Sequence, residues 1–128
     1  MTEQLDLVRT FVHIDNAGNA KPVKVTSSFW RDTSAKYARV LGAFDFKSND
    51  DLHSSMQEVH PEADEVLFLA SGAIDVLIEE AGVERVVSLE AGQAAVVARG
   101  LWHRLVMRRP GKLLFINSRA GMQGRDVR

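Results

Sequence analysis

The sequence predicts an all-β domain, a sandwich or a barrel, and three observations lead to this prediction. Apolar and polar residues alternate with a period of two in several short runs. Glycines separate these runs, and Gly72, Gly82 and Gly92 recur at ten-residue intervals. Amphipathic helical periodicity is hard to find anywhere. Short strands with a turn signal every 8–12 residues or so are typical of β-sandwiches and β-barrels. We expect the sheet to close or double, as in a jelly roll, because this removes exposed strand edges.

The individual strands follow from this alternation. Residues 73–79 and 86–90 each place apolar side chains on one face and Ser, Asp or Glu on the other, which is the pattern of half-buried strands. Residues 80–82 form the expected hairpin turn between them, since Gly accepts the positive φ that such turns need. The run 113–116 is apolar throughout and predicts a covered strand. The one predicted α-helix is short and spans residues 3–9.

The length of 128 residues is common for one domain with a core of its own. We expect an N-terminal extension with peripheral strands at 1–35, a β-barrel at 36–118 and a loosely ordered tail at 119–128. The segment 30–38 is predicted to be a loop with one helical turn. No low-complexity linker divides the chain.

The composition excludes several functional classes. A net charge of -1 with 45% hydrophobic and 26% charged residues is ordinary for a folded domain, and it lacks the basic surplus of nucleic-acid-binding proteins. The absence of cysteine excludes disulfides, thiolate metal ligands and a cysteine nucleophile. No secretory signal and no apolar run of ~18 residues is visible. We therefore expect a soluble cytoplasmic protein with no membrane or nucleic-acid partner.

Charge is unevenly spread along the chain. Residues 45–90 contain twelve acidic residues against Lys47 and Arg85, whereas residues 99–128 contain eight basic residues and one acid, Asp126. Either a basic tail meets an anionic partner, or acidic and basic strands become neighbours in the fold. The basic residues are scattered rather than consecutive, which favours the second interpretation.

Two segments carry residues that predict a polar pocket. Glu58 and His60 are two apart and so point the same way on a strand. Glu65 follows after a short turn at the head of an apolar strand, where a carboxylate needs a partner. Further along, the apolar run 94–97 and a glycine turn lead to His103. If these hairpins pack together, two imidazoles and one or two carboxylates form a site for Mn, Fe, Ni or Zn.

These two segments resemble the two motifs of the cupin superfamily. The first motif is matched, with its spacing, at His60, Glu65 and Gly72. The second motif is matched at Gly92, Gly100 and His103. The resemblance covers about residues 36–118 and implies a double-stranded β-helix, the cupin type of jelly-roll barrel.

The resemblance also implies ligands. It assigns His60, Glu65 and His103 to a divalent metal ion, with Glu58 in place of the family's first histidine. As a fourth ligand, Glu58 would favour harder ions such as Mn or Fe(II); alternatively, Glu58 is a catalytic general base. The second motif departs from the family pattern at Ala98, where proline is usual, and at Met107, where asparagine is usual.

The function that the resemblance implies is a metal-dependent oxygenase or isomerase acting on a small polar metabolite. The alternative is a non-catalytic binding or sensing cupin that has lost its metal and holds a small molecule with the same polar groups. Small cupins often dimerise, so a homodimer is expected, in which the segment 11–14 extends the sheet of a neighbouring copy.

Other polar residues are predicted to lie outside the pocket. On an unbroken strand His53 has the opposite parity to His60 and faces away, and Arg104 has the opposite parity to His103. His13 lies on a predicted peripheral strand and is expected to be a surface or packing residue. The residues expected to pack in the core or to line the barrel mouth are Phe44, Phe46, Met56 and Trp102.

Overall fold

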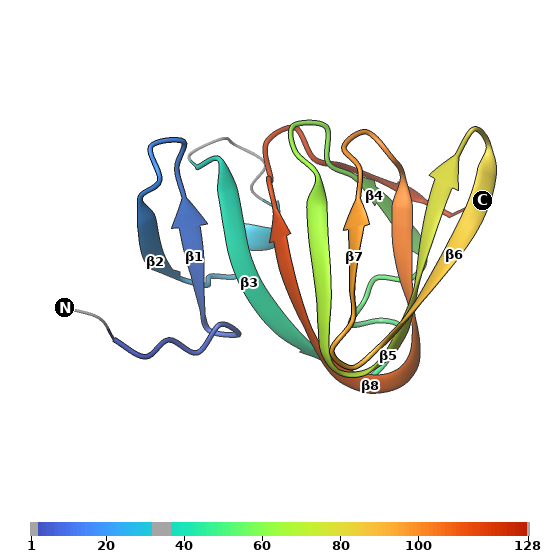
Figure 1. The fold of residues 1–128 in the computed structure, drawn as a ribbon, viewed down its shortest axis with the longest axis horizontal. Helices are drawn as coiled ribbons and strands as arrows, with labels where there is room; N and C mark the ends of the chain where they lie inside the picture. The colour runs from blue at the N-terminus through green and yellow to red at the C-terminus, as the bar shows by residue number, and fades with distance from the viewer. Residues whose placement is uncertain (1–2, 32–36, 128) are drawn as a thin grey trace.

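The computed structural model describes residues 3–31 and 37–127, and its strands form one continuous antiparallel sheet that folds over on itself (Figure 1). The elements of the described part, in chain order, are β1 (Thr10–Ile14), β2 (Ala20–Lys24), the 3-10 helix η1 (Phe29–Arg31), β3 (Arg39–Phe46), β4 (Met56–Val59), β5 (Glu65–Glu80), β6 (Val83–Glu90), β7 (Ala94–Val97), β8 (His103–Asn117) and β9 (Gln123–Asp126). The all-β prediction is confirmed. In these ranges η1 is the longest helix, so none is long and apolar enough to cross a membrane.

The long strands β5 and β8 run through both layers of the fold. In one layer, residues 65–69 at the start of β5 pair with residues 113–116 at the end of β8. β7 pairs with the other side of β5, and β3 pairs with the other side of β8. In the other layer, residues 73–80 at the end of β5 pair with residues 103–109 at the start of β8. Here β6 pairs with β5, and β4 pairs with β8. Both strands curve through the bottom of the view in Figure 1 as they pass between the layers.

The bend between the layers depends on a close backbone approach. The register of β5 and β8 shifts between Leu69 and Ile74. At the centre of the shift Gly72 has a φ of +84°, and a Cβ at this position would overlap the carbonyl oxygen of Pro110. Glycine is required here because it adopts a positive φ without strain and has no Cβ to clash with the neighbouring backbone.

The predicted alternation holds in the core. Ile74, Val76 and Ile78 on β5 are all buried, with exposures of 0 to 2%. The other apolar side chains that are almost completely buried in the core, at 0 to 2% exposure, include Phe11, Val40, Phe46, Leu69, Val97 and Leu113. The hairpin at Ala81–Gly82 is confirmed, with φ values of +52° and +78°, as a tight two-residue β-turn requires. Burial of this apolar face is what drives the sheet to double.

The uneven charges of the chain are resolved by strand pairing. Arg108 on β8 lies 2.9 Å from Asp75 and 3.3 Å from Glu90, and Arg104 lies 3.2 Å from Glu84. Arg125 on β9 lies 2.9 Å from a carboxylate of β5. These contacts confirm that the acidic and basic strands become neighbours.

Several predictions about the ends of the chain are corrected. Residues 3–9 form no helix: the carbonyl oxygen of Asp6 accepts hydrogen bonds from the amides of Arg9 and Thr10, which makes a single turn before β1. The tail, predicted to be loosely ordered, contains β9, which pairs with β4 over four residues. Within 30–38 the helical turn is η1, and residues 32–36 lie outside the described residues.

The segment 11–14 does not offer a free edge for a neighbouring copy. β1, which contains it, is paired with β2 on one side and with β3 on the other. Its first apolar residue, Phe11, is 1% exposed and packs edge-on against Phe115 at 5.3 Å. The homodimer itself stays a prediction.

Candidate metal centre

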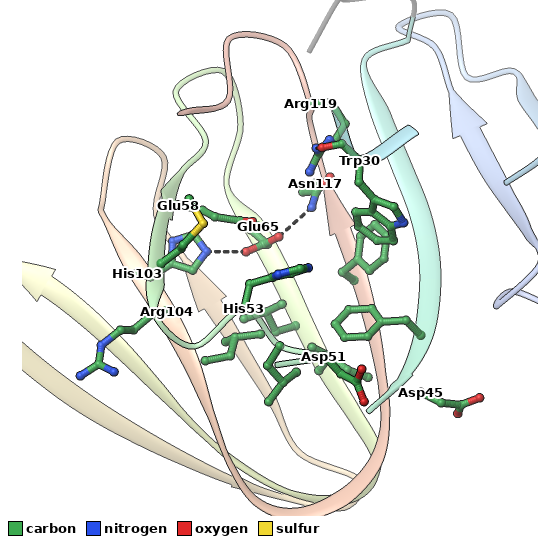
Figure 2. A pocket seen from close by; sticks show the side chains of 17 residues that line it. Trp30, Asp45, Asp51, His53, Glu58, Glu65, His103, Arg104, Asn117 and Arg119 are labelled. Atoms are coloured by element: carbon green, nitrogen blue, oxygen red, sulfur yellow. Dashed lines mark hydrogen bonds and ion pairs between the residues drawn. The ribbon is translucent and has the colours of Figure 1, made fainter. Parts of the chain in front are cut away.

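Four polar side chains from two distant parts of the sequence meet inside the fold. Glu58 lies on β4 and His60 directly after it, Glu65 is the first residue of β5, and His103 is the first residue of β8. β4 and β8 are in register, with Glu58 opposite His103. This pairing places both sequence segments in one cluster, as predicted from their spacing (Figure 2).

Glu65 is the centre of the cluster. Its Oε1 lies 2.8 Å from Nε2 of His103, and its Oε2 lies 3.3 Å from Nε2 of His60. The side-chain amide of Asn117 donates a hydrogen bond of 2.7 Å to Oε2. Glu65, His60 and His103 are all at most 5% exposed. Glu58 is different: its side chain is 41% exposed, and its Oε2 lies 3.8 Å from Nε2 of His60.

The two histidines are oriented as metal ligands are. Nδ1 of His60 is 3.0 Å from the carbonyl oxygen of Ser118, and Nδ1 of His103 is 3.1 Å from that of Leu101. Because a carbonyl only accepts, each Nδ1 carries the hydrogen and each Nε2 faces the cluster. Metal-binding histidines are commonly held by such a bond from the second ring nitrogen.

The donor atoms fit a metal ion. One atom each from Glu58, His60 and His103 lie within 4.8 Å of one another. Nε2 of His60 is buried, and its 3.3 Å contact with Oε2 of Glu65 lacks the geometry of a full hydrogen bond within the part of the chain that the structure describes. A buried nitrogen with only a poorly aligned contact costs free energy, and an ion between these atoms would reduce that cost.

Charges inside the cluster shift the pKa values of its members. Burial alone would raise the pKa of Glu65, but hydrogen bonds and charges from His103 and His60 outweigh burial and hold it well below its usual range. Burial alone would lower the pKa values of His60 and His103, but Glu65 outweighs burial and raises both. Each imidazole therefore keeps its proton to a higher pH than usual, and a metal ion that binds below that pH would have to displace the proton.

A cavity of about 250 Å³ opens beside the cluster (Figure 2). Glu58, Glu65 and His103 form part of its wall. Most of the remaining wall is apolar, from Trp30, Phe44, Leu52, Met56, Leu67, Leu105, Leu113 and Phe115. An apolar cavity with a few convergent polar groups is the usual form of a small-molecule site.

One histidine prediction is wrong. His53 borders the cavity rather than facing away from it. The parity argument assumed an unbroken strand, but residues 51–55 form a turn in which His53 has a φ of +51°. His13 lies on β1 as predicted, with its ring centroid 4.1 Å from that of Tyr37.

The other secondary predictions have mixed outcomes. Phe44 and Met56 border the cavity, whereas Phe46 is buried in the core. Trp102 does not border the cavity; the guanidinium carbon of Arg125 lies over its ring, 4.0 Å from the ring centroid. Arg104 borders the cavity, but its side chain points away from it, as its parity predicts (Figure 2). Its guanidinium lies 3.2 Å from Glu84.

Two residues of the cavity wall, Asn117 and Arg119, were not predicted from the sequence. A signal for Asn117 exists, because it follows Leu113 and Phe115 at intervals of two and so shares their inward face. A polar residue at an inward position is informative. Arg119 continues the same interval just beyond the end of β8.

Neither the protein-family models nor the curated protein sequences give a match to this chain. Among solved structures, a cupin-2 domain protein from Shewanella frigidimarina superposes with a TM-score of 0.50 and 15% identity, over 66% of this chain and 74% of that one. Recombinant oxalate oxidase in complex with glycolate superposes with a TM-score of 0.54 and 21% identity, over 67% of this chain and 45% of that one. Cobalt(II) HppE in complex with its substrate superposes with a TM-score of 0.56 and 15% identity, over 91% of this chain and 57% of that one.

This chain spans less than two thirds of the length of the latter two proteins. The likenesses show that it has the cupin jelly-roll fold.

Proposed function

We propose that this cupin-fold chain binds one divalent metal ion through His60, His103 and Glu65, with Glu58 as the fourth ligand or as a catalytic base, and that it acts on a small polar metabolite in the adjoining cavity. One observation carries the proposal: two buried imidazoles present their Nε2 atoms to two carboxylates, while backbone carbonyls hold their other nitrogens. The ion is Mn, Fe, Ni or Zn, and the second carboxylate favours the harder Mn or Fe(II). Such an ion supplies Lewis-acid or redox chemistry of the oxygenase or isomerase type.

The protein groups have distinct tasks in this proposal. Ser118 and Leu101 hold the imidazoles in place through their carbonyl oxygens. Asn117 holds Glu65 through its amide. Glu58 is the partly exposed member and borders the cavity, so it is either the fourth ligand or a catalytic base that takes a proton from the bound molecule. The apolar wall keeps water away from this exchange.

The structural neighbours support the proposal at the level of the fold. Iron(II) and cobalt(II) are named with two HppE structures, and glycolate with oxalate oxidase. Those proteins hold a metal ion or a small molecule, which is what the cluster and cavity of this chain are proposed to do. Because one fold supports many activities, the reaction type has to be argued from the site itself.

Metal analysis of the purified protein tests the proposal. We expect protein saturated with Fe(II), Mn(II), Ni(II) or Zn(II) and then dialysed to retain about one ion per chain. A His60→Ala/His103→Ala double variant should retain none, and His13→Ala, a histidine remote from the cluster, should match the wild type. Wild-type protein that retains no ion, or a double variant that retains as much, would refute it.

One observation favours the alternative of a non-catalytic binding protein. Glu65 already has partners for both oxygens, from His103 and Asn117, without an ion. If the cluster is purely structural, a chelator should leave the melting temperature unchanged while small-molecule binding persists. The homodimer and the cytoplasmic location stay predictions. Light scattering that shows only monomer would refute the homodimer.

A further inference from the structure

Arg119 is a buried cation that lacks a carboxylate partner in the described part of the chain. It is 2% exposed, and the one hydrogen bond that it makes to a described residue runs from Nη2 to the carbonyl oxygen of Trp30 at 2.6 Å. Its Nε is buried and has no partner within residues 3–31 and 37–127. By contrast, the more exposed Arg108 and Arg125 each contact a carboxylate at 2.9 Å. Burying a charge without a counter-charge is costly, so such groups are rarely left unpaired without a reason.

The surroundings of Arg119 hold it at the wall of the cavity. Its guanidinium carbon lies 5.3 Å from the ring centroid of Phe29 and 5.7 Å from that of Trp30, distances at which a cation is attracted to an aromatic ring. Arg119, Trp30 and Asn117 border the same cavity as Glu65 (Figure 2). Oδ1 of Asn117 is a second buried atom without a partner in the described ranges.

We propose that the ligand of this cavity is a small organic acid and that Arg119 binds its carboxylate. The inference rests on the proposed function, because the same cavity adjoins the metal cluster. A planar guanidinium matches a carboxylate better than any other side chain does, through two parallel N–H donors. The free Oδ1 of Asn117 would accept a hydrogen bond from a hydroxyl group on the same molecule.

The charge balance of the site supports a monoanion. Glu58 and Glu65 together neutralise a divalent ion, which leaves the positive charge of Arg119. One carboxylate on the ligand would neutralise it. Among the residues that the structure describes, the other acids that border the cavity are Asp45 and Asp51; both are exposed at its rim, and Asp45 is already 3.8 Å from Lys112. A neutral or cationic ligand would leave Arg119 unpaired.

Tryptophan fluorescence provides the test, because Trp30 borders the cavity and Trp102 is the only other tryptophan in the chain. In a Trp102→Phe background that has been stripped of metal with EDTA and then desalted, acetate is titrated against its neutral analogue acetamide, with chloride keeping ionic strength constant. We expect saturable changes in Trp30 emission with acetate and none with acetamide. In Arg119→Met the half-saturating concentration should rise at least about tenfold. Arg109→Gln, which removes an exposed arginine, should leave it unchanged.

A second readout does not depend on ligand affinity. Arg119→Met keeps an unbranched apolar stem against the aromatic rings and removes the unpaired charge. Without carboxylates in the buffer its melting temperature should therefore be no lower than that of the parent. Equal responses to acetate and acetamide up to ~100 mM in the parent would overturn the proposal, as would equal acetate responses in parent and variant.

The two proposals fail separately. Because the titration is done on metal-free protein, acetate binding that depends on Arg119 but no retained metal ion would refute the metal centre alone. A retained metal ion without any acetate response would refute the role of Arg119 alone. Arg119→Met should retain as much metal as the wild type, since Arg119 is not among the proposed ligands.

Discussion

Replacing Glu65 by Gln is expected to destabilise the metal-free protein strongly. The carboxylate is 5% exposed and faces His103 at 2.8 Å and His60 at 3.3 Å. Gln keeps the shape but removes the charge that stabilises both imidazolium groups. Breaking a buried pair in this way costs about 3–5 kcal/mol. For a domain of this size, such a loss lowers the melting temperature by roughly 10–20 °C.

Thermal unfolding followed by circular dichroism in EDTA measures this loss. The pKa values of His60 and His103 are raised in the folded state. Their stabilising contribution is therefore complete below the unfolded histidine pKa of about 6.5 and is lost as the pH rises through the folded values. The deficit of Glu65→Gln should be larger at about pH 6 than at about pH 9.

Glu58→Gln is the matched control for this experiment. Its carboxylate is 3.8 Å from His60 and its side chain is 41% exposed, so solvent screening limits the loss to less than about 1 kcal/mol. Equal losses in the two variants, or a deficit of Glu65→Gln that grows with pH, would refute the reasoning.

Two further predictions concern the protons of the histidine cluster and the glycine at the bend between the layers. Metal affinity should fall as the pH falls through the raised pKa values of His60 and His103, because an ion must displace their protons; calorimetry in buffers of different ionisation enthalpy measures the protons released, and binding without release would contradict this. Gly72→Ala should cost more than about 3 kcal/mol in urea unfolding, because positive φ and the overlap with Pro110 add together. Gly82→Ala, with a similar φ but nothing within 4 Å of the added Cβ in the described part, should cost about 1–2 kcal/mol, and equal losses would show that the overlap is unimportant.

Much of the fold was predictable because its signals are local. The alternation at Ile74, Val76 and Ile78 follows from the pleat of a strand, in which successive side chains point to opposite faces. The turn at Ala81–Gly82 follows from the positive φ that it requires. The common direction of Glu58 and His60 follows from the same pleat. None of these depends on which strands become neighbours.

Other features depend on contacts between distant segments and could not be predicted locally. The ends of the chain show this best: β9 is polar and short, and it is ordered because β4 offers a free edge to pair with. His53 faces the cavity because the chain turns at 51–55 instead of continuing as a strand. That Arg119 is buried without a carboxylate partner among the described residues emerges only when the neighbouring side chains are in place.

The sequence by itself determined an alternating, glycine-punctuated β-domain, because side-chain parity and turn geometry are local properties of a few residues. It also predicted that two histidines and two carboxylates share one polar pocket. The tertiary structure alone decided that Glu58 lies opposite His103, that Asn117 holds Glu65 and that a buried arginine borders their cavity. The physical reason is that strand register is selected by the burial of many apolar side chains at once. No short segment of the chain contains that information.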